Sequence, residues 1–365
     1  MVAQPVSSGS VVARRYRATR RIAAGAMGEV WEGVHVELGH RVALKVLRKE
    51  ALACREMVRR FEREAFLLAR VQSEHVVRVI DFVSRGRHGP VLVMELVEGP
   101  TFADVLHHER PSLEQIVSVA IDVLRGLRAM HASDVIHRDV KPGNVVLRPG
   151  LDGTRRAVLV DLGVGRLREE DVCDDNGDVP VVLADEITTA DRVVGTLEYM
   201  PPEQILSSQT AEATVDIYAV GAMIWRAIAG EHPFPDKHGL ELVREKVKTR
   251  VPRVRCPRHD AAGRRLEAIV ARAMEFKPVD RWPNDDAMID ALEEVRAELR
   301  ARPAAGTEPD PEEVATSGRV ARRRARSIRR KALLAVAAAC ATAVAAYSSY
   351  TWHQPPPRAA SVVVP

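Results

Sequence analysis

The sequence predicts an α+β fold in which short strands come first and helices follow. Residues 16–97 hold short apolar runs separated by turns, whereas residues 112–130 and 285–300 repeat apolar side chains at helical spacing. A further observation points to an enzyme, because residues 135–147 set five polar or charged side chains between two apolar runs that resemble buried strands. Buried charge is costly unless it is paired or used, so we expect an active site at this turn.

Length and composition bound the class of protein. The 365 residues leave room for one large domain and a tail, and a hydrophobic content of 46% is ample for a core. The formal net charge is +4, and the basic excess is concentrated at residues 14–21 and 319–331, so a nucleic-acid partner is not expected. Residues 1–15 lack an apolar stretch, which predicts a flexible N-terminus without a cleaved signal peptide. No Cys-x-x-Cys pair is present, which disfavours a zinc site and fits a reducing compartment; the four cysteines are Cys54, Cys173, Cys256 and Cys340.

The polar turn runs from His137 to Asn144 and reads His-Arg-Asp-Val-Lys-Pro-Gly-Asn. It resembles the catalytic loop of protein kinases, and a lysine two residues after the aspartate is typical of serine/threonine kinases. The resemblance implies a two-lobed protein-kinase fold, with a small lobe of β-sheet plus one helix and a larger, mainly helical lobe. It also implies that Asp139 accepts the proton of the acceptor hydroxyl, Lys141 stabilises the transferring group and Asn144 binds Mg²⁺.

Small residues at Ala24–Gly28 separate two predicted strands, Tyr16–Ala23 and Glu29–His35. The second strand argues against a dinucleotide-binding fingerprint, which needs a helix there, and the sequence has no Gly-Lys-Ser/Thr for a P-loop. The segment resembles the kinase glycine-rich loop, whose main chain covers the phosphates of ATP, but Ala23 replaces the first glycine and is expected to weaken nucleotide affinity modestly. The nucleotide-binding residues that the resemblance implies here are Ile22, Ala23, Gly25, Gly28 and Val30.

The next predicted strand contains Val-Ala-Leu-Lys, which resembles the kinase strand whose lysine binds the α- and β-phosphates. The resemblance therefore makes Ala43 and Lys45 nucleotide-binding residues. The predicted helix Arg55–Val71 carries Glu64, which matches the family glutamate that pairs with this lysine. Glu62 is the alternative partner, and Glu64 is preferred because Phe-x-Arg-Glu-Ala matches the family form.

Two further strands are predicted, the second at Pro90–Val97. By resemblance the second strand binds adenine at the junction of the lobes. Met94 is then the gatekeeper, and main-chain groups of Glu95 and Val97 bond to the base. A capping box at Ser112–Gln115 predicts the start of the helix that leads to the catalytic loop.

Asp161 opens an Asp-Leu-Gly stretch that resembles the kinase Asp-Phe-Gly motif, so it is expected to bind Mg²⁺ together with Asn144. The stretch that ends at Glu203, Gly-Thr-Leu-Glu-Tyr-Met-Pro-Pro-Glu, resembles the end of a kinase activation segment and its platform for a protein substrate. Near the end of the domain, Arg281 matches the family arginine that pairs with this glutamate. That pair is expected to be structural.

The predicted activation segment carries nine acidic residues within 169–191 and few large apolar ones, which predicts a mobile loop. Its candidate phosphorylation sites are Thr188 and Thr189, together with Thr196 near the catalytic aspartate. Arg138 is the residue that would pair with a phosphate there. The alternative is a solvated acidic loop without a regulatory role.

The tail contains a run without charge that is long enough for one membrane-spanning helix. Arginines before the run indicate a cytoplasmic flank, which implies a single-pass protein of the inner membrane with a cytoplasmic kinase domain. A soluble alanine-rich helix or a peripheral basic anchor is the alternative. The predicted parts are the flexible N-terminus 1–15, the kinase domain 16–300 (small lobe 16–97, large lobe 98–300), the linker and basic juxtamembrane segment 301–331, the transmembrane helix 332–352 and the extracytoplasmic tail 353–365.

The resemblance covers residues 16–300 and is to eukaryotic-like, Hanks-type serine/threonine kinases, in the arrangement of the bacterial membrane-attached members. It implies transfer of the γ-phosphoryl group of ATP to serine or threonine hydroxyls of proteins, with ATP and Mg²⁺ as cofactors. It also implies autophosphorylation in trans within a homodimer, in bacterial signalling. Two alternatives stay open: a membrane-tethered pseudokinase scaffold that binds nucleotide without transfer, and a small-molecule kinase of related fold.

Deletion of residues 332–352 should move the protein from the membrane fraction to the soluble fraction, because the deletion removes the predicted span. Cell fractionation followed by immunoblotting measures the distribution. Deletion of residues 353–365 is the matched control and should leave the protein with the membranes. A 332–352 deletion that still sediments with membranes would contradict the predicted span.

Overall fold

The computed structural model describes residues 4–25, 28–150, 152–161, 197–206 and 212–301. The chain divides into two compact units, Met1–Pro303 and Ala304–Pro365, and the described residues belong to the first. Among them, no helix combines the length and the apolar character that crossing a bilayer requires. The predictions that lie outside the described residues concern the acidic run 169–191, the candidate sites Thr188, Thr189 and Thr196, and the segments 302–331, 332–352 and 353–365.

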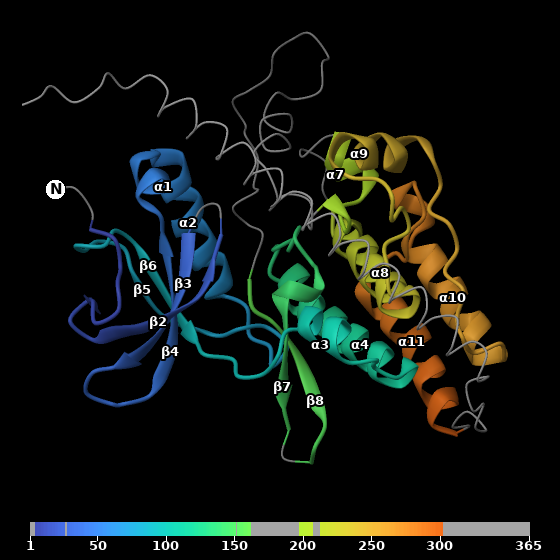
Figure 1. Ribbon diagram of the computed structural model, residues 1–365, viewed down its shortest axis with the longest axis horizontal. Helices are drawn as coiled ribbons and strands as arrows, with labels where there is room; N and C mark the ends of the chain where they lie inside the picture. The colour runs from blue at the N-terminus through green and yellow to red at the C-terminus, as the bar shows by residue number, and fades with distance from the viewer. Residues whose placement is uncertain (1–3, 26–27, 151, 162–196, 207–211, 302–365) are drawn as a thin grey trace, which may run out of the picture. The chain divides into compact units, whose positions relative to one another are not determined.

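The small lobe, blue to cyan in Figure 1, is built on one antiparallel sheet of six strands. Their order is β1-β2-β3-β4-β6-β5. Its central strands are apolar on both faces because both faces are covered. Ala43 and Met94 belong to the main core with α2, whereas Val42 and Leu44 belong to a second buried cluster. The elements are β1 (Val11–Val12), β2 (Tyr16–Ala24), β3 (Gly28–His35), β4 (Arg41–Leu47), α1 (Lys49–Ala53), α2 (Arg55–Leu68), β5 (Val79–Val83) and β6 (Val91–Glu95).

The N-terminal residues differ from the sequence prediction, which treats residues 1–15 as flexible. β1 lies within this stretch and pairs with the start of β2. Val6 and Val12 are buried in the second cluster, against apolar side chains of β4 and β6. This packing removes the outer face of the sheet from water, and the gain from burying it orders residues 4–15.

The large lobe is mainly helical, and its core lies where α4, α8, α10 and α11 pack together (Figure 1). α4 begins at the predicted capping box, since Ser112 Oγ accepts the Gln115 N–H at 3.2 Å and Gln115 Oε1 accepts the Ser112 N–H at 2.8 Å. The sequence analysis predicts α4 and α11 but not α3, α9 and α10. The elements are α3 (Phe102–His108), α4 (Leu113–His131), η1 (Pro142–Asn144), β7 (Val145–Pro149), β8 (Arg155–Leu159), α7 (Pro202–Leu206), α8 (Thr214–Ala229), α9 (Gly239–Lys248), α10 (Ala261–Ala273), η4 (Pro278–Asp280) and α11 (Asp285–Ala301).

The segment His75–Val77, which leads from α2 to β5, is bonded to the large lobe. The Val77 N–H donates to Leu159 O at 2.8 Å and the Leu159 N–H donates to His75 O at 2.9 Å, so the segment lies along β8 in parallel register. The close approach needs Gly126 in α4, because a Cβ there would lie 2.8 Å from His75 O.

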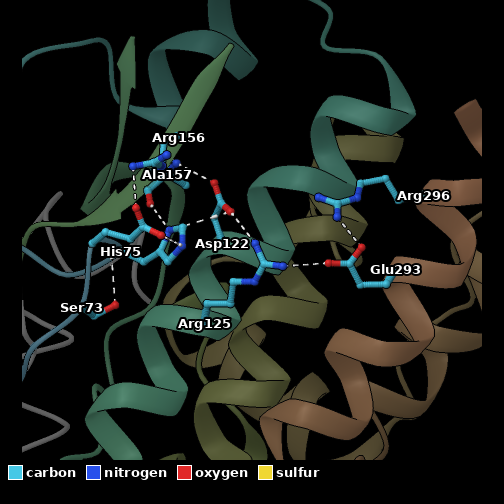
Figure 2. A network of polar contacts seen from close by, with 9 residues as sticks. Ser73, His75, Asp122, Arg125, Arg156, Ala157, Glu293 and Arg296 are labelled. Atoms are coloured by element: carbon cyan, nitrogen blue, oxygen red, sulfur yellow. Dashed lines mark hydrogen bonds and ion pairs between the residues drawn. The ribbon is translucent and has the colours of Figure 1, made fainter. Parts of the chain in front are cut away.

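Figure 2 shows the polar network that fastens this segment. His75 Nδ1 lies 3.1 Å from Ala157 O, and the Ala157 N–H donates to Asp122 Oδ2 at 3.1 Å. Arg125 lies between two carboxylates, with Nη1 3.7 Å from Asp122 Oδ1 and Nη2 2.9 Å from Glu293 Oε1. Both main-chain groups of Ala157 are therefore bonded to side chains, and one network joins the segment, β8, α4 and α11.

A buried ion pair ties the start of α7 to the end of the domain, as the sequence predicts. Arg281 donates from Nη1 and Nη2 to the two carboxylate oxygens of Glu203 at 2.6 and 2.8 Å, and Arg281 is 1% exposed. Its Nε donates to Glu275 O and its Nη1 also donates to Thr214 O. Every nitrogen of the buried guanidinium is thus bonded, which satisfies the condition for burying a charge.

Glu203→Ala should lower the free energy of unfolding by about 3 kcal/mol, because it leaves the buried Arg281 without its carboxylate. Urea denaturation measures the loss. Glu241→Ala is the control, since that exposed carboxylate lies 3.9 Å from Lys237 Nζ and its removal should cost less than about 0.5 kcal/mol. Equal losses in the two variants would argue against a structural role for the buried pair.

Candidate active site

The predicted catalytic residues lie on a loop shortly after α4. Residues 135–141 have no regular secondary structure, and they lead through η1 into β7. The apolar run Val135–Ile136 is therefore not the strand that the sequence suggests. The reason is that the next main-chain N–H groups, those of His137 and Arg138, bond to a carboxylate rather than to a neighbouring strand.

Asp139 contacts both other candidate catalytic residues. Lys141 Nζ donates to Asp139 Oδ2 at 2.8 Å, and Asn144 Nδ2 donates to Asp139 O at 2.8 Å and to Oδ2 at 3.1 Å. The Asp139 N–H donates to His137 Nδ1 at 3.3 Å. Burial lowers the pKa of His137, which favours the neutral ring that can accept this hydrogen bond. The three candidates thus form one compact set.

A fully buried carboxylate on α8, Asp216, fixes the path of this loop. Its Oδ2 accepts the N–H of His137 and its Oδ1 accepts the N–H of Arg138, both at 2.8 Å. Arg138 has a positive φ of 64°, a left-handed conformation that a residue with a Cβ keeps only where its surroundings hold it. The paired hydrogen bonds to Asp216 provide that constraint one residue before Asp139.

His131, the last residue of α4, supports Asp216 in turn. Its Nε2 lies 2.9 Å from Asp216 Oδ2 and its Nδ1 lies 2.7 Å from Asp285 Oδ2. Burial alone would lower the pKa of His131, but the hydrogen bonds to the two carboxylates raise it to about 10, so the ring is protonated at neutral pH. Burial would also raise the pKa of Asp216, and the contact with His131 holds it below its ordinary value instead.

Lys45 joins the small lobe to the large one. Its Nζ donates to Glu64 Oε1 on α2 at 2.6 Å and to Asp161 Oδ1, just beyond β8, at 2.7 Å. The pairing uses Glu64 rather than the alternative Glu62. Burial alone would lower the pKa of Lys45, but the carboxylates of Asp161 and Glu64 raise it above its ordinary value. The ammonium therefore stays charged where the two lobes meet.

Predicted nucleotide-binding residues lie opposite one another on neighbouring strands. Ala23 pairs with Val30 across β2 and β3, and Val30 pairs with Lys45 across β3 and β4. Ala43 pairs with Met94 across β4 and β6. Because Ala43 and Lys45 are two residues apart in a strand, they share one face of the sheet. The sheet thus brings these five residues together on the face that carries the Lys45 ammonium.

The predicted glycine-rich turn is closed by a hydrogen bond from the Gly25 N–H to Gly28 O at 2.7 Å. A Cβ at Gly28 would lie 2.4 Å from Val46 O, so the close approach of β3 to β4 requires glycine there. Ile22, two residues before the end of β2, is 43% exposed, so part of its apolar side chain is open to solvent.

The strand predicted to bind adenine ends at Glu95. The Glu95 N–H donates to Arg78 O at 2.9 Å, so this N–H is not available to a base. Its side chain instead bonds within the protein, 3.0 Å from Arg148 Nη2. Val97 follows, partly buried against the main core.

The residues at the end of β8 fit a magnesium ion. The Val160 N–H donates to Asn144 O at 3.0 Å, which brings Asp161 next to Asn144. Asp161 offers a carboxylate with 48% of its side chain exposed, and Asn144 uses Nδ2 toward Asp139, so its amide oxygen is the atom that it can offer. No group of three or more His, Cys, Asp or Glu among the described residues could hold a metal. Mg²⁺ commonly takes one or two protein oxygens and completes its shell with water and substrate phosphates.

Sequence reasoning assigns no role to His131 or to Gln204. Gln204 Nε2 donates to Arg138 O at 3.0 Å, which ties the end of the activation-segment motif to the catalytic loop. Both side chains act on residues far away in the chain, so no local spacing marks them. The only available signal was a histidine at the end of an apolar helix, which is also compatible with ordinary capping.

Comparison with known proteins finds a matching family and several relatives. A family model described as the protein kinase domain matches residues 16–291. Serine/threonine-protein kinase pkn2 of Myxococcus xanthus is 37% identical over 220 residues, which are 60% of this chain and 25% of that protein. From Mycobacterium tuberculosis, PknL is 32% identical over 286 residues (78% of this chain, 66% of that protein), and PknA is 31% identical over 318 residues (86% and 67%).

The chain thus spans a quarter of the length of pkn2 and about two thirds of the length of PknL and PknA. The crystal structure of the PknI kinase domain from Mycobacterium tuberculosis shares the fold. It aligns with a TM-score of 0.58 and 24% identity, over 80% of this chain and 99% of that one.

His131→Gln should destabilise the protein more at low pH than at high pH. The ring is protonated more readily in the folded state, with a pKa of about 10 against 6.5 when unfolded. Its contribution is therefore complete below about pH 6.5 and is lost as the pH rises toward 10. Urea unfolding should show a loss of about 2 kcal/mol at about pH 6 that shrinks by about pH 10. A loss that does not change with pH would exclude the ionic contact as its source.

Proposed function

Because the chain belongs to the protein kinase domain family and is a serine/threonine protein kinase, we propose that it transfers the γ-phosphoryl group of ATP to serine and threonine hydroxyls of other proteins. The contact of Lys45 with both Glu64 and Asp161 carries the proposal. It joins the phosphate-binding cation of the small lobe to the metal-binding candidate of the large lobe.

Asp139 is the proposed proton acceptor. It lies in hydrogen-bond contact with Lys141 and Asn144, and the Asp216 contacts hold the loop before it. A carboxylate in this position orients the acceptor hydroxyl and takes its proton as the new bond to phosphorus forms. Lys141 then offers positive charge beside the transferring group, where negative charge develops.

Lys45 is the proposed ligand of the α- and β-phosphates, and Glu64 keeps its ammonium in position. Glu64 is 4% exposed, so its carboxylate stays bonded to Lys45 rather than to water. Asp161 and Asn144 would hold Mg²⁺, which, when bound, neutralises charge on the phosphates. The main chain of Glu95 and Val97 would bond the adenine, packed against Ala43 and Met94.

Autophosphorylation at Thr188, Thr189 or Thr196 is a further part of the proposal, with a homodimer as the arrangement for transfer in trans. It is supported by the acidic sequence around the first two threonines and by Arg138, which precedes Asp139. We also propose attachment to the inner membrane through residues 332–352, on the basis of their uncharged sequence. These features suit a role in bacterial signalling.

The test is phosphoryl transfer by the purified full chain in mild detergent, with labelled ATP and Mg²⁺ and a generic acceptor protein. Asp139→Asn should lower kcat at least about 100-fold and leave ATP affinity largely intact, because it removes the proton acceptor and keeps the side-chain shape. Asp134→Asn is the matched control, since Asp134 is exposed and has a positive φ that asparagine adopts readily. Equal activity of Asp139→Asn and wild type would refute the assigned role.

Lys45→Met should abolish label incorporation, whereas Lys49→Met, at an exposed lysine close by, should retain it. Phosphosite mapping of the wild type tests the activation-segment proposal, which requires phosphate on Thr188, Thr189 or Thr196. An unlabelled wild type that is stabilised against heat by nucleotide would favour the pseudokinase scaffold instead.

A further inference from the structure

Lys246 is a fully buried lysine that the phosphoryl-transfer mechanism does not use. It lies on α9 and is 2% exposed. No carboxylate among the described residues is within ion-pair distance of its Nζ, in contrast to Lys45 with its two. A buried ammonium is costly unless its hydrogens are bonded, so its contacts define what it does.

The contacts of Lys246 are with main-chain carbonyls of one short segment. Its Nζ donates to Glu198 O at 2.7 Å and to Met200 O at 2.9 Å. The Nζ also lies 5.6 Å from the ring centroid of Tyr218 on α8, within range of the aromatic face. The two hydrogen bonds therefore hold the segment Leu197–Met200 against α9, and the aromatic contact places the Lys246 Nζ beside α8.

Apolar packing brings α9 to the same segment. Leu197, Met200 and Ile205 form a buried cluster with Leu242 of α9, and partly buried side chains of α9 pack around it. The cluster attracts the helix but does not fix the main chain of the segment, because apolar contact has no direction. The two hydrogen bonds from Lys246 supply that direction.

The segment leads directly to the catalytic loop. Two residues after Pro202, Gln204 Nε2 donates to Arg138 O, next to Asp139. Glu203 between them is fixed by Arg281. The segment that Lys246 holds is thus linked, through Glu203 and Gln204, to the residue that precedes Asp139.

We propose that Lys246 is a positioning residue for the protein substrate, because it fixes the main chain of the segment Leu197–Met200 and, through it, the site where the acceptor chain meets Asp139. The proposal rests on the proposed function. Lys246 touches neither nucleotide nor the reacting atoms, so it acts on acceptor affinity and not on ATP.

The protonation of Lys246 gives the proposal a second readout. Burial lowers the pKa of Lys246 to about 7, and the Glu198 carboxylate offsets this only in part. Glu198 itself is bonded to His232 and lies 3.7 Å from Arg226. Arg250, Arg253 and Glu275 line the same pocket as Lys246 and Tyr218. Above neutral pH the amine keeps two N–H groups for the two carbonyls but loses the charge that strengthens those bonds.

Lys246→Met, which keeps volume and removes the donors, tests the proposal in the full chain. The KM for a generic acceptor protein such as casein should rise about tenfold, with the KM for ATP within about twofold of wild type. Lys248→Met, at an exposed lysine of the same helix, should leave both unchanged. A folded Lys246→Met protein with wild-type acceptor KM overturns the proposal. Absence of transfer in wild type and Lys248→Met alike would overturn the proposed function as well.

Measurement across pH keeps the test valid if Lys246→Met does not fold. In wild type and Lys248→Met, the acceptor KM should rise about threefold from about pH 6 to about pH 8.5 while the ATP KM stays level. In a folded Lys246→Met protein this rise should be absent. An acceptor KM in wild type that does not change across this range overturns the proposal.

Discussion

The hydrogen bonds from two consecutive main-chain N–H groups to the buried carboxylate of Asp216 are the constraint on which the candidate active site depends. They hold Arg138 in a left-handed conformation and so set the direction in which Asp139 leaves the loop. Besides these N–H groups, the positive charge of His131, which Asp285 shares, compensates the burial of the carboxylate. Three helices, α4, α8 and α11, thus meet at one carboxylate, and the rigidity of the helical core is transmitted to a loop that has no secondary structure of its own.

Buried cations mark the places where parts of the chain distant in sequence are joined. Lys45 joins the two lobes through two carboxylates, and Arg281 joins α7 to the region before α11 through one carboxylate and several carbonyls. Lys246 differs because it is held by carbonyls and an aromatic face. The carboxylates beside Lys45 and Arg281 compensate the positive charges of these side chains. Lys246 has no such partner among the described residues, so its ammonium can lose its proton near neutral pH.

Local patterns predicted most of what lies close together in the chain. The spacing of Asp139, Lys141 and Asn144 predicted a catalytic loop, and the capping box predicted the start of α4 where it lies. The sequence could not predict that residues 4–15 are ordered. These residues are ordered because they cover a face of the folded sheet that would otherwise be exposed. The contacts of His131 and Lys246 could not be predicted for a similar reason. Each contact joins residues that are dozens of positions apart, and such pairs leave no periodic pattern in the sequence.

The segment His75–Val77 belongs to the small lobe by chain order and to the large lobe by hydrogen bonding. A rotation of the small lobe must therefore bend the chain between this segment and β5, since the segment itself stays with β8. Lys45 and Glu64 then travel as one body, while Asp161 remains behind at the end of β8. Separation of the lobes breaks the Lys45–Asp161 contact and spares the Lys45–Glu64 contact. Opening of the lobes would thus free one hydrogen of the Lys45 ammonium for an incoming anion.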